Sequence, residues 1–281
     1  MMRIYLEGVG LCGPGLDGWA ASRAVLAGAQ DHVPAPTRVP PSPLLPANER
    51  RRAVQTVRLS LAVGAEAFAV AGRHPSATAT VFASSGGDGE TIHEILSVLA
   101  SPNRELSPTR FHNSVHNTPA GYWGIATEAR TPSSSLCCHD DSFAAGLLEA
   151  AVQATVEQQP VALIAYDVQY PAPLCDVRPI GAELAVALVL TPEPSNKALA
   201  SVELLLRPRS GAVSIMPLAS LEALRRSTPA ARSLPLLAAL ARRDKATVTL
   251  DYLTDMTMAL DVVPIQADLA LGVGGSERVP G

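Results

Sequence analysis

The sequence predicts a layered α/β fold with a mainly parallel central sheet, and two observations lead to this prediction. Residues 160–168 and 183–190 form near-continuous apolar runs, which are typical of central strands covered on both faces. Segments with apolar residues three or four apart alternate with such strands and indicate helices that pack on them. The chain has 281 residues, of which 47% are hydrophobic, and this is enough to bury a sizeable core.

Apolar spacing, capping residues and prolines define the elements of the first hundred residues. The spacing predicts one long helix over residues 49–72, with Asn48 as its N-cap. Six prolines within residues 34–46 forbid regular structure and predict a surface crossing. The glycine-rich turn at residues 85–89 lacks the lysine of a phosphate-binding loop, so we expect it to have a conformational role. The other predicted elements here are strands 3–10 and 77–84 and helices 17–27 and 90–99.

The stretch over residues 107–151 holds three of the six histidines and two of the four cysteines. The sequence predicts a polar loop, a small-residue helix over 119–129, a buried strand over 133–138, and a second helix. Asp140 and Asp141 stand at the start of that helix, where we expect their carboxylates to cap unpaired amides. A strand that turns sharply into a helix is a place where enzymes often position a nucleophile, so this stretch is the candidate functional site.

The chain after this stretch divides into weaker elements. Residues 1–192 are predicted to form the main α/β unit, and residues 193–265 to complete or extend it. The last predicted segment is a flexible tail over residues 266–281. Within the second segment we expect strands at 201–206 and 247–250 and helices at 218–226 and 234–242.

Composition excludes several classes of protein. The net charge of −4 and the scattered basic residues argue against a nucleic-acid partner. No apolar run reaches the roughly 20 residues that a membrane span needs, so we expect no membrane association and a cytoplasmic location. Four cysteines in a chain of this length do not resemble an extracellular disulfide framework, and reduced thiols are the expectation.

Two groups of residues are candidates for chemistry. Cys137 and Cys138 end a strand beside a helix N-terminus, where a thiolate nucleophile is plausible, but buried cysteines also serve as small core residues. Adjacent side chains cannot easily converge on one ion, so no metal site is expected. His112 and His116 lie among prolines and asparagines, and we interpret them as hydrogen-bonding residues of a buried loop. Serine hydrolase chemistry is excluded, because no G-x-S-x-G motif occurs and no histidine follows His139.

Several short motifs follow one another in a specific order: Asp17-Gly18-Trp19, Glu49-Arg50-Arg51-Arg52, Ser85-Gly86-Gly87, Asn117 with Ala120-Gly121, Arg130 with Pro132-Ser133, and Gly181-Ala182-Glu183. In this order they resemble the N-terminal half of a β-ketoacyl synthase, the condensing enzyme with the thiolase fold. The resemblance implies that residues 1–192 are a β-ketoacyl synthase N-terminal-like domain with a layered α-β-α architecture. The loop Asn113-Ser114-Val115-His116-Asn117, with Gly121-Tyr122-Trp123 in the following helix, most resembles the short ketosynthase-like subunits of aryl polyene pathways.

The register of this resemblance places Asp140 at the position of the family's nucleophilic cysteine. Placing Cys138 there needs a two-residue shift that breaks the match of the following helix. The family's two catalytic histidines lie in its C-terminal half, and this chain has no histidine after His139. The resemblance therefore implies a non-acylating subunit without catalytic residues, metal, cofactor or independent activity, in which the cysteines are core residues and the carboxylates are caps.

The resemblance also implies a partner. We expect a chain-length-factor type of subunit that forms a heterodimer with a full-length β-ketoacyl synthase, shapes its acyl tunnel and meets the acyl carrier protein indirectly. Two alternatives stay open: an active synthase or acyltransferase that uses Cys138, and a scaffold protein unrelated to acyl chemistry. The candidate tunnel or interface residues are Phe111, His112, His116, Asn117, Tyr122 and Trp123.

Overall fold

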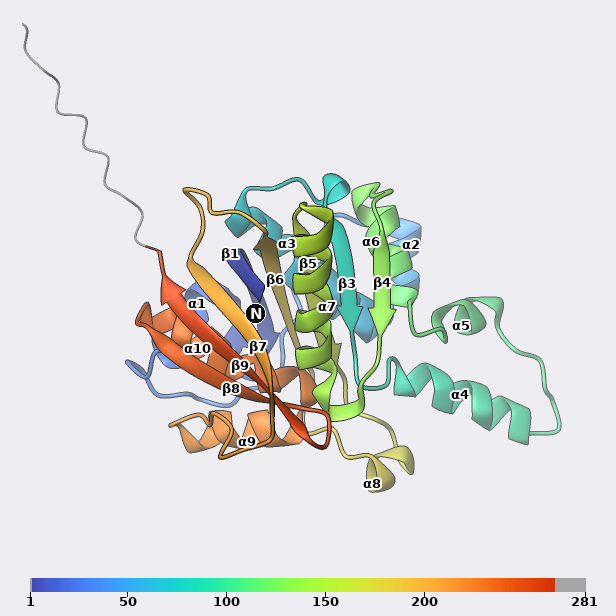
Figure 1. The fold of residues 1–281 in the computed structure, drawn as a ribbon. Coiled ribbons are helices and arrows are strands. Elements are labelled where there is room, and N and C mark those ends of the chain that lie inside the picture. The colour runs from blue at the N-terminus through green and yellow to red at the C-terminus, as the bar shows by residue number, and fades with distance from the viewer. Residues whose placement is uncertain (1, 266–281) are drawn as a thin grey trace, which may run out of the picture.

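The computed structural model describes residues 2–265, which form one nine-stranded sheet with helices on both faces (Figure 1). The predicted tail at 266–281 lies outside the described residues. The strands are β1 (Met2–Gly13), β2 (Leu16–Asp17), β3 (Ala79–Ala83), β4 (Ser133–Leu136), β5 (Val161–Asp167), β6 (Leu184–Thr191), β7 (Ala200–Pro208), β8 (Ala246–Tyr252) and β9 (Met256–Pro264). The α-helices are α1 (Trp19–Leu26), α2 (Ala47–Arg52), α3 (Gln55–Ala71), α4 (Gly89–Ala100), α5 (Pro108–Asn113), α6 (Thr118–Thr127), α7 (Ser142–Glu157), α8 (Leu174–Val177), α9 (Ala219–Ser227) and α10 (Leu234–Arg242), and the 3-10 turns are η1 (Pro75–Ala77), η2 (His139–Asp141) and η3 (Pro229–Ser233).

The strand order of the sheet is β4-β3-β5-β6-β1-β7-β9-β8, with β2 paired to β1. Strand β3 runs parallel to β4 and β5, and the remaining pairings among residues 2–265 are antiparallel. The sheet is therefore mixed, and the prediction that it is mainly parallel was wrong, because most of its strand pairings are antiparallel. The physical reason is that parallel neighbours need a long crossover, whereas β8 and β9 are joined by a tight turn at residues 253–255.

The predicted layered α-β-α arrangement is confirmed by two hydrophobic clusters on opposite faces of the sheet. One cluster joins alternate residues of the strands to α1, α7 and α10, and the other joins the intervening residues to α3 and α6. Strands β5 and β6 contribute to both clusters and are buried along their whole length, as their apolar sequences predict. Helix α3 packs so tightly on β1 that a side chain at Gly8 or Gly10 would overlap the carbonyl oxygens of Ala67 and Val63.

The predicted long helix at 49–72 is interrupted. Ala53 and Val54 adopt extended backbone angles, which separate α2 from α3, and Gly72 ends α3 in the left-handed conformation. The side-chain amide of Asn113 donates to the carbonyl of Arg52 at 2.9 Å and so satisfies the end of α2. This partner lies 61 residues away in the chain, so the periodicity of the local sequence did not reveal the break.

Three further differences concern strands β4 and β9 and the polar loop. Strand β4 is half-exposed rather than buried, because it forms an edge of the sheet beside β3. Part of the predicted polar loop is the short helix α5, which begins at Pro108, since proline fits the first turn of a helix. Strand β9 was not predicted, although it lies between β7 and β8. Strands β7, β9 and β8 extend the same sheet beyond β1, because β7 pairs with β1.

Helices α4 and α5 form an arm that lies beside the layered body rather than within it (Figure 1). We call residues 89–113 the α4–α5 arm. In α4 the buried residues are Gly89 and Thr91, both in its first turn, where Asp88 caps the helix by accepting from the amide of Thr91 at 2.9 Å. The arm is thus anchored to the body at its start and its end, and most of its length is exposed.

Candidate functional site

The candidate site lies where β3, β4 and β5 end side by side at one edge of the sheet. Asp167, the last residue of β5, is buried, and its carboxylate accepts hydrogen bonds from the amide and hydroxyl of Ser85 at 2.9 and 2.6 Å. Its other oxygen accepts from the amide of Ala230 at 2.7 Å. Burial raises the pKa of Asp167 to about 6, although these hydrogen bonds and the Arg178 guanidinium act in the opposite direction.

The turn from β4 into α7 is closed by a hydroxyl. The Ser142 Oγ accepts from the amide of Cys138 at 2.9 Å and donates to the carbonyl of His139 at 2.7 Å. His139 has a φ of 50°, in the left-handed region that non-glycine residues rarely adopt. The predicted sharp turn from a strand into a helix is therefore present, and its backbone is held in an unfavourable conformation.

The two carboxylates of this turn do not cap α7, so the capping prediction was wrong. Asp140 forms ion pairs with Arg178 at 2.6 Å and with Arg232 at 3.2 Å. Asp141 pairs with Arg232 at 2.5 Å and accepts from the amide of Leu253 at 2.9 Å. Hydrogen bonds from guanidinium groups are stronger than those from neutral amides, so the arginines draw both carboxylates away from the helix end.

The cysteines are not core residues of the strand, in contrast to the prediction. Cys137 is exposed because it lies beyond the end of β4, and its thiol donates to the carbonyl of Ser85 at 3.2 Å. Cys138 is half-buried, and burial, together with the charge of Asp141, raises the pKa of its thiol. A raised pKa disfavours the thiolate that a nucleophile requires.

The glycine-rich turn after β3 has the conformational role that the sequence predicted, because its glycines let the side chain of Tyr170 pack closely against the backbone. A side chain at Gly86 would overlap the hydroxyl of Tyr170, which follows β5, and a side chain at Gly89 would overlap the ring of the same residue. Burial, followed by the charge of Asp167, raises the pKa of the Tyr170 hydroxyl. The ring of Tyr170 thus fills the space over this turn and leaves no room there for a phosphate group.

The six candidate tunnel or interface residues divide between the surface and the core. His112 lies edge-on to Tyr122, with ring centroids 6.1 Å apart, and both line a cavity of about 480 Å³ between α2, α5 and α6. Phe111 is exposed on α5, at 64% of its surface. Trp123 instead lies in the core against Phe68, with ring centroids 5.5 Å apart.

The two remaining candidates have different environments. His116 is half-buried, and its Nε2 lies 3.3 Å from the carbonyl oxygen of Ser84, at the end of β3. Asn117 is exposed at the N-cap of α6, where its side chain forms no capping bond. The interpretation of these residues as hydrogen-bonding residues of a buried loop is confirmed for Asn113, which joins Tyr122 to α2. It was wrong for His112, which is exposed on α5 and whose ring forms no hydrogen bond within residues 2–265. Asn113 accepts from the Tyr122 hydroxyl at 3.3 Å.

Sequence reasoning missed Asp167, Tyr170, Arg178 and Arg232. A signal existed for Asp167, since it is the one charged residue in the apolar run at 160–168, and a buried carboxylate needs partners. The arginines gave no such signal, because they lie 38 and 92 residues from Asp140 in the sequence. Their role depends on the three-dimensional fold.

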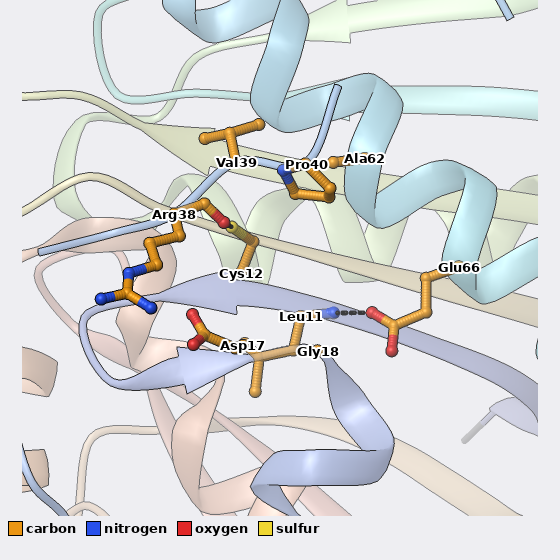
Figure 2. A pocket seen from close by; sticks show the side chains of 9 residues that line it. All are labelled: Leu11, Cys12, Asp17, Gly18, Arg38, Val39, Pro40, Ala62 and Glu66. Carbon is orange, nitrogen blue, oxygen red and sulfur yellow. Dashed lines mark hydrogen bonds between the residues drawn. The ribbon is translucent and has the colours of Figure 1, made fainter. Parts of the chain in front are cut away.

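A separate cavity of about 460 Å³ lies under the proline-rich crossing (Figure 2). The carboxylate of Glu66 accepts from the amide of Leu11 in β1 at 2.9 Å and from the amide of Trp19, the first residue of α1, at 2.6 Å. It therefore caps this end of α1. The Cys12 thiol on the cavity wall donates to the carbonyl of Arg38 at 3.4 Å, and burial raises its pKa to about 12. This thiol is consequently unreactive at neutral pH.

Two negative findings apply to residues 2–265. No group of three or more His, Cys, Asp or Glu side chains is placed to hold a metal ion within this part of the chain. None of the helices there is both long enough and apolar enough to cross a lipid bilayer.

A layered α-β-α body in which a strand turns sharply into a buried helix is characteristic of the thiolase-like class of folds. The family model of the β-ketoacyl synthase N-terminal domain matches residues 19–250. The chain belongs to this family, as the motifs in its sequence predicted. No curated protein matches the sequence.

Solved structures agree with this assignment of the fold. A structure of a ketosynthase (ApeO) in complex with its chain length factor (ApeC) from Xenorhabdus doucetiae is similar, with a TM-score of 0.71 and 20% identity over 93% of this chain and 100% of the matched chain. The ishigamide ketosynthase/chain length factor has a TM-score of 0.70 and 13% identity over 94% and 100%. The AntDE:AntF complex, a type II polyketide acyl-carrier protein with its ketosynthase, has a TM-score of 0.73 and 11% identity over 94% and 99%. At these identities the likeness establishes the thiolase-like fold.

Proposed function

We propose that this chain is a non-acylating, chain-length-factor type of subunit that pairs with an active β-ketoacyl synthase and shapes its acyl tunnel. The biosynthetic setting that we propose is a fatty-acid or polyketide pathway of the aryl polyene kind. The observation that carries the proposal is Asp140. Its carboxylate stands in the turn between β4 and α7 and is paired with Arg178 and Arg232.

The chemistry of acylation supports a non-acylating role. A condensing enzyme forms a thioester on a cysteine and uses imidazole groups to stabilise the enolate oxyanion. A carboxylate held by two guanidinium groups cannot form a thioester, and its negative charge opposes a developing oxyanion. The raised pKa of Cys138 disfavours the neighbouring thiol as a substitute, and the chain has no histidine after His139.

The surface around the α4–α5 arm supports a partner subunit. Five large apolar side chains on or beside the arm are between 42% and 64% exposed, which is unfavourable unless another protein covers them. Strand β4 lies at the edge of the sheet next to this region, and its outer side has no partner strand among residues 2–265. The five side chains are Leu96, Leu99, Phe111, Val115 and Ile125.

The cavity between α2, α5 and α6 supports a role in shaping a tunnel. His112 and Tyr122 line it together with the exposed Ile125, so a partner that covers Ile125 would also close the cavity. In two of the similar structures a ketosynthase is present with a chain length factor. We propose the same kind of heterodimer here, with the acyl carrier protein engaged through the ketosynthase.

Co-expression tests the proposal. The chain is expressed together with a complete β-ketoacyl synthase from the same source, and the complex is purified through a tag on the ketosynthase. We expect a stable complex with one copy of each chain. A monodisperse monomer that does not bind the ketosynthase would contradict the proposal.

Two matched variants locate the interface. Phe111→Asp and Val156→Asp each place a charge on a side chain that is 64% or 69% exposed, so neither change should disturb the core. Phe111 lies in the arm, whereas Val156 lies on α7. We expect Phe111→Asp to weaken binding at least about tenfold, because burying an aromatic ring contributes about 1.5–3 kcal/mol and the charge opposes burial. Val156→Asp should bind like the unmodified chain, and equal effects would place the interface elsewhere.

A further inference from the structure

A small cavity of about 180 Å³ lies away from the turn of Asp140, between α1, the β6–β7 connection and the end of α10. Its apolar floor is formed by Trp19, Leu199 and Leu240, and two of these side chains, Trp19 and Leu240, are 6% exposed. Arg23, Lys197 and Arg243 line it, but the ammonium of Lys197 lies against Gly72, outside the lining, so the two arginines are the charged groups of its rim. An apolar floor with a few convergent charged groups is the usual composition of a site for a small molecule.

The charge of this rim is one-sided. No Asp or Glu lines the cavity among residues 2–265, and none of the three cations forms an ion pair within that part of the chain. The Lys197 ammonium lies against Gly72 at the C-terminal end of α3, where the helix dipole favours a cation, and therefore does not contribute to the charge that faces the cavity.

Two helices far apart in the sequence supply the arginines of the rim. Arg23 is in the last turn of α1, and Arg243 follows α10 in a left-handed conformation with a φ of 58°. The chain as a whole carries a net charge of −4, so this pair of arginines has the opposite sign to the net charge. Clefts lined by one sign of charge concentrate the opposite ion.

We propose that this cavity binds a phosphate-type oxyanion, either free phosphate or the phosphate end of a small phosphomonoester. Two guanidinium groups match the charge of a dianion better than that of a monocarboxylate, and the fork of an arginine suits two phosphate oxygens at once. The volume exceeds the roughly 30 Å³ of one water molecule several-fold, which leaves space beside Trp19 for a short organic group. This site is independent of the proposed pairing with a ketosynthase.

The test uses the full-length chain without a partner. Inorganic phosphate and phenyl phosphate are titrated separately at low ionic strength, and binding is followed by phosphorus NMR line width and by tryptophan emission. Trp19 and Trp123 are the two tryptophans of the sequence, and Trp123 lies in the other hydrophobic cluster, so a change in emission reports on Trp19. We expect saturable binding that weakens as salt is added, since salt screens exposed charges.

Adjacent arginines at the end of α10 provide a matched pair of variants. Arg243→Gln removes a charge from the rim, whereas Arg242→Gln removes the same charge from an exposed neighbour that does not line the cavity. We expect at least a fivefold loss of affinity for Arg243→Gln and less than a twofold loss for Arg242→Gln. Arg23→Gln is a second rim variant and should behave like Arg243→Gln.

The outcomes separate the sources of the anion and can overturn the proposal. Phenyl phosphate that binds at least fivefold more tightly than inorganic phosphate assigns the site to phosphomonoesters, and equal affinities assign it to free phosphate. Equal losses for Arg242→Gln and Arg243→Gln would reduce the effect to general electrostatic attraction and refute the site. No saturable binding of either compound to the unmodified chain would also refute it.

Discussion

The buried carboxylate of Asp167 makes the stability of this protein depend on pH in a direction opposite to that of an ordinary surface aspartate. Its pKa is raised from 3.8 to about 6 by burial, so the folded state holds its proton more tightly than the unfolded state does. Stability from this group is therefore fully present below pH 3.8. It is lost as the pH rises through about 6.

The magnitude follows from the two pKa values. The difference between about 6 and 3.8 corresponds to about 3 kcal/mol of unfolding free energy, at about 1.4 kcal/mol per pH unit. About half of this loss, roughly 1.4 kcal/mol, falls between pH 5 and pH 7.5, because the group is already largely ionised in the unfolded state at pH 5. Asp167→Asn removes this dependence. It also leaves the amide of Ala230 without an acceptor, at a pH-independent cost of about 1–3 kcal/mol.

Urea unfolding at pH 5.0, 6.0, 7.0 and 7.5 measures the effect. The unfolding free energy of the unmodified chain should exceed that of Asp167→Asn by the largest amount at pH 5.0, and the difference should shrink by about 1.4 kcal/mol toward pH 7.5. A difference that stays constant with pH would refute the reasoning, since it would mean that the pKa of Asp167 is not raised. A difference that grows with pH would indicate a lowered pKa instead.

Three further predictions concern the candidate site. Asp140→Asn should leave the condensing activity of the proposed complex largely unchanged and cost about 1 kcal/mol of stability, because the ion pairs it breaks are partly exposed; a complete loss of activity would assign Asp140 a catalytic role. Iodoacetamide mapped by mass spectrometry at neutral pH should modify exposed Cys137 first, Cys138 more slowly and buried Cys12 least, whereas rapid selective modification of Cys138 would favour the active-enzyme alternative. Gly86→Ala should lower the unfolding free energy by about 1–3 kcal/mol through overlap with the Tyr170 hydroxyl, and added Tyr170→Phe should recover part of this because it removes that hydroxyl; equal stabilities of Gly86→Ala and the unmodified chain would contradict the overlap.

Much of the layered body was predictable from the sequence, because buried strands and helices have characteristic local patterns of apolar residues. The apolar runs that became β5 and β6 are buried along their whole length, and such strands tolerate few polar residues. Gly28 and Gly72 end or follow helices with positive φ angles, where glycine is favoured. The family was recognisable for a related reason: its motifs are short turns and helix starts whose residues are fixed by geometry.

The features that were not predictable depend on contacts between distant segments. The break between α2 and α3 is held by Asn113, and the orientation of Asp140 is set by Arg178 and Arg232. Local rules favoured a continuous helix in the first case and a helix cap in the second. The mixed strand directions of the sheet were also not predictable, because they follow from the connections between strands, which apolar patterns do not encode.

The turn from β4 to α7 bears on where catalysis would occur in the proposed complex. The Cys137 thiol donates a hydrogen bond to the carbonyl of Ser85, and the raised pKa of Cys138 disfavours its thiolate at neutral pH. The Asp140 carboxylate forms ion pairs with two arginines. We therefore expect the nucleophile of the proposed complex to come from the partner subunit. The turn of this chain instead contributes ion pairs that tie β4 and α7 to η3 and to the segment before β6.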